Sequence, residues 1–168
     1  MTILRHFSKT TLNYKNGPAL FEIGNDRFSH WLDGQGMIHS FKFKDGKITY
    51  SNKFLQSSNL KRHTQAGKIA VSEFGTEPSQ TLMGRFVDSV FKRPEEYQNA
   101  NVNIKMVAGR LLALTEMPIQ MEICPLTLDT LSPVRYQDSH PIGHLVSSHP
   151  HTMKDGTVIN VSTIFDTG

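Results

Sequence analysis

Short stretches in which apolar and polar residues alternate are the main pattern of this chain. Residues 37–44 place Phe41 and Phe43 on one side of an extended strand and polar residues on the other. The pair Asp45-Gly46 follows, which favours a tight hairpin turn, and residues 47–50 return alongside. A two-residue loop sets the register, so one apolar face forms. The expected cross-strand pairs are Phe43 with Ile48 and Phe41 with Tyr50.

Other stretches repeat this pattern between turn residues, at roughly ten-residue spacing. Such spacing is typical of all-β sandwiches, barrels and propellers. A Pro-containing turn with Asp129 and Thr130 lies within residues 121–131, as in the links between the middle strands of propeller blades. Periodicity alone does not choose among these architectures. The further strands that we predict are residues 19–23, 68–74, 102–107, 111–115, 120–123 and 157–164.

Residues 79–91 are the exception, because their apolar residues recur at helical spacing. This pattern predicts a short amphipathic helix, whose apolar side packs on the core or, alternatively, lies on a membrane surface. The expected fold class is therefore all-β with one short helix. The apolar helix positions are Leu82, Met83, Phe86, Val90 and Phe91.

The composition fits a globular domain with a solvated surface. Hydrophobic residues make up 38% of the 168 residues and charged residues 20%, which is enough apolar material for a core. Basic and acidic residues are interleaved, with a net charge of +3. Such interleaving is typical of an ordinary surface, and a basic face for anionic lipid or nucleic acid is the alternative.

The single cysteine, Cys124, excludes an intrachain disulfide and favours a reducing compartment. It stands among apolar residues, which favours a small buried side chain over a nucleophile. Residues 1–15 lack the apolar stretch of a signal peptide, and no apolar run is long enough to span a bilayer. We therefore expect a cytoplasmic protein, with any membrane contact peripheral.

Residues 145–160 hold the sharpest candidate site. His149 and His151 stand two apart, so in an extended strand their side chains point the same way. Pro150 between them donates no ladder hydrogen bond, which predicts a strand end, edge or bulge. A second Asp-Gly pair, residues 155–156, predicts a hairpin. Imidazoles at strand ends can hold Fe, Cu, Ni or Zn, although His-x-His alone is more often structural.

Glu116 and the other histidines have ordinary explanations as well as functional ones. Glu116 ends an apolar strand and is either solvated, which the residues alone favour, or turned inward toward a partner. A metal-bound histidine whose second ring N–H needs an acceptor would be such a partner. His39 shares a face with Phe41, as hydrogen-bonded core histidines do. His6 and His63 stand in polar stretches that we expect to be exposed.

Eight segments, taken in order and with their spacing, resemble one known family. They are residues 16–24, 27–34, 37–41, 50–57, 71–76, 115–116, 125–131 and the Ser-His-Pro-His motif at 148–151. Together they resemble the carotenoid cleavage oxygenases, and look most similar to the animal β-carotene oxygenases and the retinal pigment epithelium isomerohydrolase. The likeness covers nearly everything from Asn16 to Ile164, and no single motif carries it.

The resemblance implies a seven-bladed β-propeller with Fe(II) on its axis, held by four histidines from different blades. His149 matches the first iron ligand of the family, whereas His151 matches none. Glu116 matches a carboxylate that accepts a hydrogen bond from an iron-bound histidine. Thr115 matches a position near the iron and the oxygen pocket. Open positions on the Fe(II) imply O2 activation and cleavage of a C=C bond in a carotenoid or apocarotenoid.

The chain is short for such a propeller. A four-stranded blade takes ~40 residues, so seven blades need roughly 280. Three of the four iron ligands would lie beyond residue 168. Residues 77–80 lack the Asp-Pro-Cys-Lys sequence of vertebrate members, so a lipid-modified cysteine is not expected there. We expect residues 1–168 to be an incomplete single propeller domain, with 1–15 as an atypical lead-in, inactive by itself.

Three functions stay open at this point. The first is an Fe(II) dioxygenase that uses O2 on a carotenoid or apocarotenoid, with isomerohydrolase chemistry on retinyl esters as its variant. The second is a non-catalytic carotenoid-binding module. The third is an unrelated small all-β metal protein of the cupin type, which the long ordered resemblance disfavours. No nucleic-acid partner is expected.

Overall fold

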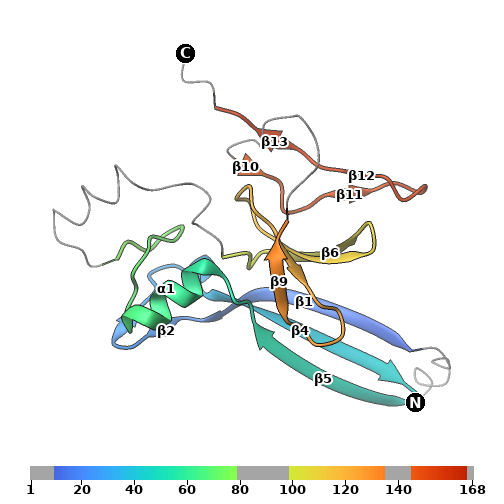
Figure 1. Cartoon of the computed structure of the whole chain (residues 1–168), viewed down its shortest axis with the longest axis horizontal. Coiled ribbons are helices and arrows are strands. Elements are labelled where there is room, and N and C mark those ends of the chain that lie inside the picture. The colour runs from blue at the N-terminus through green and yellow to red at the C-terminus, as the bar shows by residue number, and fades with distance from the viewer. Residues whose placement is uncertain (1–9, 79–98, 135–144, 166–168) are drawn as a thin grey trace.

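The computed structural model describes residues 10–78, 99–134 and 145–165, and two antiparallel sheets form its centre (Figure 1). The first sheet has the order β1-β4-β5 and the second the order β6-β7-β8-β9. The first comprises β1 (Thr11–Leu20), β4 (Gln35–Lys44) and β5 (Lys47–Phe54). The second comprises β6 (Asn103–Val107), β7 (Arg110–Leu114), β8 (Met121–Ile123) and β9 (Thr130–Pro133).

Shorter elements surround these sheets. Three pairs of two-residue strands are antiparallel, and a single α-helix and a 3-10 turn complete the described part of the chain. The helix lies beside the β2–β3 hairpin at one end of the first sheet (Figure 1). These elements are β2 (Glu22–Ile23) with β3 (Asp26–Arg27), β10 (Leu145–Val146) with β13 (Ser162–Thr163), β11 (His151–Thr152) with β12 (Val158–Ile159), η1 (Trp31–Asp33) and α1 (Ser58–Ala66).

The predicted β4–β5 hairpin is confirmed in its register. Phe43 pairs with Ile48 and Phe41 with Tyr50. Asp45 and Gly46 have φ values of 49° and 72°, the left-handed backbone that a type I′ turn requires at both central positions. The turn type therefore fixes which face of β4 is apolar.

The main core lies between the two sheets. Ile38 of β4 is fully buried and its neighbours in sequence are only half-buried, so β4 buries alternate residues. The buried face carries Ile38 and Ser40, whereas Phe41 and Phe43, on the face predicted to be apolar, are half-buried. The Tyr14 hydroxyl donates to the carbonyl of Pro125 at 3.0 Å, and burial raises the pKa of Tyr14. This bond ties β1 to the β8–β9 turn. The buried core residues are Ile38, Leu55, Ala100, Leu111, Ala113, Met121, Ile123 and Leu128.

Three expected strands and the expected exposure of one histidine need correction. Residues 68–74 form no strand, because Glu73 turns inward to buried polar partners instead of joining a ladder. His63, expected to be exposed, is fully buried for the same reason. Residues 157–164 are interrupted at Asn160, which separates β12 from β13. Residues 19–23 are split between β1 and β2.

The sequence analysis did not predict helix α1. Ser57 caps its N-terminus, accepting from Leu60 N at 3.0 Å, and Gly67 ends it in the left-handed conformation at φ 63°. The predicted helix at 79–91 lies outside the described residues. What the structure supports is a mostly β chain with one short helix. No helix of the described residues is long and apolar enough to cross a membrane.

Candidate functional site

The loop between β10 and β11, residues 147–150, carries the histidine that the sequence singled out. His149 stands directly before β11, which begins at His151, so this segment is the strand end that Pro150 predicted, and the two histidines do not lie in one extended strand. The backbone N–H of His149 donates to the Ser147 hydroxyl at 3.1 Å. Ser148 and Pro150 are buried on either side, while the imidazole is exposed in the described part of the chain. The loop therefore buries Ser148 and Pro150 and leaves the His149 side chain exposed between them.

Asn103 of β6 contacts this loop from the second sheet. Its Nδ2 donates to the Ser148 carbonyl at 2.9 Å and lies 3.4 Å from Nδ1 of His149. Lys105, two residues along β6, donates from Nζ to the Pro150 carbonyl. The position of His149 is thus set from β6 as well as by its own strand neighbours.

His151 begins β11 and pairs with Ile159 of β12. The hairpin that joins these strands is the one that the second Asp-Gly pair predicted, with Gly156 at φ 90° and Thr157 N donating to the Asp155 carboxylate at 2.9 Å. That bond lowers the pKa of Asp155. His151 is exposed.

Glu116 follows β7 at the end of the sheet that faces the histidine loop. Glu116 is exposed among the described residues. Its carbonyl accepts from Val146 N at 2.9 Å, and Val146 enters the loop that carries His149. Thr115 is buried, and the side chain of Gln120 satisfies its backbone N–H at 2.7 Å and its carbonyl at 3.0 Å. The structure thus joins Glu116 to the histidine loop through the backbone.

These residues do not complete a metal site. Within residues 10–78, 99–134 and 145–165, no group of three or more His, Cys, Asp or Glu side chains could hold an ion. Cys124 is half-buried, and hydrogen bonding from Thr127 lowers the pKa of its thiol. It sits in the β8–β9 turn, beside Pro125, and not at the histidine loop.

The structure contains a buried polar network around Glu73 that the sequence analysis did not predict. One oxygen of Glu73, Oε1, accepts from Gln35 Nε2 at 2.8 Å, Asn59 Nδ2 at 2.9 Å and His63 Nε2 at 3.3 Å. Nδ1 of His63 accepts from Ala70 N at 3.0 Å, so the neutral ring carries its proton on Nε2 and donates it to Glu73. An acid within the apolar residues 69–74 was the available signal.

Asp33 forms a second buried anchor close by. Its carboxylate accepts from Gly75 N at 3.0 Å and from the Thr76 hydroxyl at 2.5 Å. Phe74 lies between these two anchors in the sequence; the residue is 81% exposed, and its ring centroid lies 5.3 Å from that of His30. Trp31 is 68% exposed, and its ring also contacts that of His30. The hydrogen bonds of Glu73 and Asp33 thus fix the backbone before and after Phe74, while the Phe74 side chain itself stays exposed.

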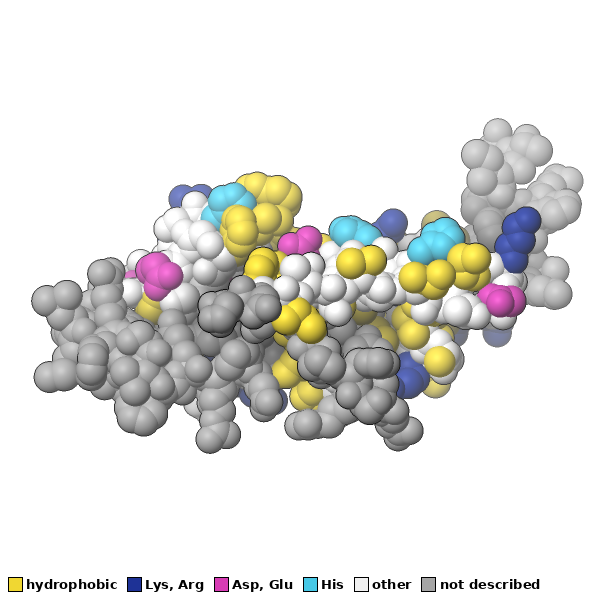
Figure 2. All heavy atoms as spheres, turned by 90° about the horizontal axis from the view of Figure 1, so that it is seen from above, with side chains coloured by type: hydrophobic (Ala, Val, Ile, Leu, Met, Phe, Trp, Pro, Cys, Tyr) yellow, Lys and Arg dark blue, Asp and Glu magenta, His cyan; other side chains and the backbone are white. Residues whose placement is uncertain are grey.

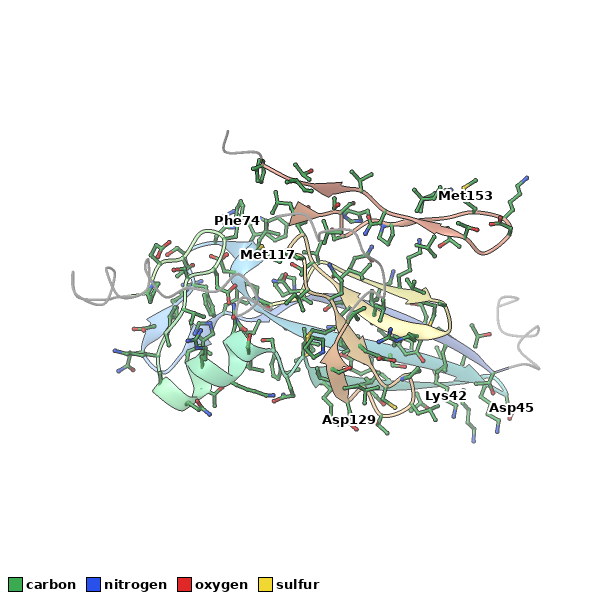
Figure 3. All side chains as sticks on the ribbon, turned by 45° about the horizontal axis from the view of Figure 1, so that its top comes forward. Lys42, Asp45, Phe74, Met117, Asp129 and Met153 are labelled. Atoms are coloured by element: carbon green, nitrogen blue, oxygen red, sulfur yellow. The ribbon has the colours of Figure 1, made fainter. Side chains whose placement is uncertain are left out.

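Figure 2 views the molecule from the side on which β10–β13 lie and shows apolar side chains and histidines along this face, with acidic and basic side chains between and beside them. Phe74 and Met117 both lie toward this side in Figure 3, with Met153 at the far hairpin. An open groove of about 600 Å³ adjoins Trp31. It is lined by Phe21, Arg27, Phe28, Ser29, His30 and Trp31. An apolar face with imidazoles suits an apolar ligand or covering segment better than a polar one.

Fold and site together define a mostly β chain in which a hydrogen-bonded loop carries the exposed imidazole of His149. Residues 12–167 match the family model described as retinal pigment epithelial membrane protein, so the chain belongs to that family. This confirms the resemblance to the carotenoid cleavage oxygenases.

Individual relatives agree. The chain is 34% identical to rat β,β-carotene 15,15′-dioxygenase over 154 residues, which is 89% of this chain and 27% of that protein. It is 37% identical to the carotenoid isomerooxygenase of Galleria mellonella over 153 residues, covering 88% and 29%. The chain therefore spans less than a third of the curated relatives that it matches.

Solved structures give the same picture. A mutant of the Synechocystis apocarotenoid oxygenase matches with a TM-score of 0.75 at 28% identity, covering 92% of this chain and 33% of that one. A cobalt-substituted form of the Synechocystis protein matches with a TM-score of 0.73 at 30% identity, covering 91% and 32%. The mostly β fold is thus shared with these proteins over the part that matches.

Proposed function

We propose that this chain is part of a non-haem Fe(II) dioxygenase that cleaves a C=C bond of a carotenoid or apocarotenoid with O2. The observation that carries the proposal is the buried-flanked, backbone-anchored loop that presents His149 in a member of this family. We also propose that the described sheets belong to the first blades of a seven-bladed propeller. Residues 1–168 would then be one part of that domain, although Thr11 to Lys15 of the expected lead-in already belong to strand β1.

The residues present fit one position of an iron centre. A neutral imidazole suits Fe(II) and Co(II) alike, and the cobalt-substituted Synechocystis protein shows that a relative accepts Co. His149 would supply one ligand, and histidines of other blades the rest. Bound there, Fe(II) would supply open positions at which O2 is activated.

The other residues of this chain have supporting tasks in the proposal. Glu116 would accept a hydrogen bond from the second ring nitrogen of an iron-bound histidine, which fixes the orientation of that ring. Thr115, buried at the end of β7, would lie near the oxygen pocket. A polyene offers almost nothing to hydrogen-bond, so the shape of the apolar surroundings would select the bond that is cut.

Removing the metal tests the function directly. The protein expressed from its complete gene, loaded with Fe(II), should convert a carotenoid or apocarotenoid into two carbonyl fragments, and iron chelation should stop the reaction. Chromatography with mass detection measures both products. Polyene binding without products would replace the proposal by the binding module, and retinol release from a retinyl ester by the isomerohydrolase.

Glu116→Gln should lower iron affinity or turnover by roughly 10- to 100-fold, the usual effect of removing a partner that orients a metal ligand. The amide keeps the size of the side chain but is a poorer acceptor, so the folded state should persist. Iron analysis, turnover and circular dichroism measure the three quantities. Turnover equal to that of the wild type would show that Glu116 is only a surface acid.

A further inference from the structure

Side chains from other elements bind the backbone of the histidine loop at several points. Three of the four carbonyl oxygens in residues 147–150 accept a hydrogen bond from such a side chain. A surface loop without regular structure commonly leaves its carbonyls to water. The donors are Asn160 to Ser147 at 2.9 Å, Asn103 to Ser148 at 2.9 Å, and Lys105 to Pro150.

Two of these donors come from one rigid strand. Asn103 and Lys105 are alternate residues of β6, so they point to the same side, and they reach the alternate carbonyls that flank His149. Strand β6 is paired along its length with β7. The Oδ1 of Asn103 accepts from Ile104 N at 2.8 Å, which fixes the end of the amide that faces the loop. The spacing of the donors therefore matches the spacing of the carbonyls.

We infer that Asn103 and Lys105 are positioning residues that fix the backbone of residues 147–150 and thereby aim the imidazole of His149. A metal ligand has to be held within about 0.5 Å of its productive place, which loops achieve poorly without support. The contact of Asn103 Nδ2 with Nδ1 of His149, at 3.4 Å, extends the same control to the ring. This inference rests on the proposed role of His149 as a metal ligand.

The chain offers a matched control. Asn101 lies two residues before Asn103, and its Nδ2 also donates to backbone carbonyls, those of Leu32 at 2.7 Å and Gly34 at 2.8 Å. Those bonds tie the same segment to η1 and leave the histidine loop untouched. Asn101→Ala therefore removes equivalent interactions without touching His149.

The test compares Asn103→Ala with Asn101→Ala in the protein expressed from its complete gene. Asn103→Ala should speed amide hydrogen exchange in residues 147–151 and weaken Co(II) binding by roughly 10- to 100-fold, measured by calorimetry. Asn101→Ala should leave both quantities near their wild-type values. Equal exchange rates in the two variants, or equal Co(II) affinities, would overturn the inference.

Lys105 supplies a second variant pair for the case in which Asn103→Ala fails to fold. Lys105→Met keeps the apolar stem and loses the donor, so it should weaken Co(II) binding, and Lys105→Arg should restore it. Failure of Arg to restore binding would refute the donor role. If His149→Ala binds Co(II) as tightly as the wild type, the proposed function fails instead. Amide hydrogen exchange in residues 147–151 then decides alone whether Asn103 and Lys105 fix the backbone of this loop.

Discussion

His149→Ala should abolish iron occupancy in the protein expressed from its complete gene, with Fe(II) affinity at least roughly 100-fold weaker. Partners that only orient a ligand already contribute 10- to 100-fold to metal affinity, so loss of the ligand itself should exceed that. The side chain is exposed among the described residues, so its truncation opens no cavity in the core described here. Folding should therefore be retained while iron is lost.

His151→Ala is the matched control for this experiment. It removes an exposed imidazole only two residues away, on β11, beside the same buried Pro150. Elemental analysis after reconstitution should find iron in His151→Ala and none in His149→Ala. Full iron in the second variant would refute the ligand assignment, and loss from both would show that the loop, rather than one ring, was damaged.

The strands of the second sheet and the β4–β5 hairpin were largely predictable, because turn residues and alternating apolar residues are visible in the local sequence. The Asp45-Gly46 pair permits left-handed backbone at both turn positions, which fixed the register of β4 and β5 before any tertiary contact was known. Strands β6, β7 and β8 were predicted within one or two residues, because their alternating or apolar runs end at Gly and Pro. Register and alternation are local properties, and the sequence displays them.

Helix α1 and the anchors of the histidine loop were not predictable in this way. In α1 the buried face consists of Asn59, Leu60 and His63. Only one of these is apolar, so the helical repeat of apolar residues from which a helix is predicted is almost missing. The contacts of Asn103 and Lys105 with the loop each span 45 residues of sequence. No local pattern encodes such a pairing. The family resemblance singles out His149 but does not show which side chains hydrogen-bond to its loop.

The inward turn of Glu73 leads to the second large expected effect. Glu73→Ala should lower the free energy of unfolding by about 3–5 kcal/mol, because several buried donors would lose one shared, charged acceptor. Three buried side chains donate to its one oxygen, and each would lose that acceptor: Gln35, Asn59 and His63. A buried donor left without an acceptor costs about 1–3 kcal/mol, and the three losses share one site, so they should not simply add.

Two further substitutions distinguish the loss of the buried hydrogen bonds from the mere loss of a negative charge. Glu73→Gln retains a carbonyl acceptor and should retain most of the stability. Glu122→Ala removes a charge whose 2.6 Å bond to Arg110 lies near the surface, so its effect should be much smaller. Urea unfolding followed by circular dichroism gives the three free energies. Equal losses in Glu73→Ala and Glu122→Ala would contradict the account of a buried anchor.

The same variant links this anchor to the apolar face. Glu73 adjoins Phe74, and its partners sit on α1 and at the start of β4, so the network holds the segment that presents the aromatic ring. Glu73→Ala should therefore speed hydrogen exchange in residues 70–76 and in α1 more than in the β6–β7 hairpin. A uniform increase across both regions would mean that the network stabilises the whole domain and has no particular hold on that face.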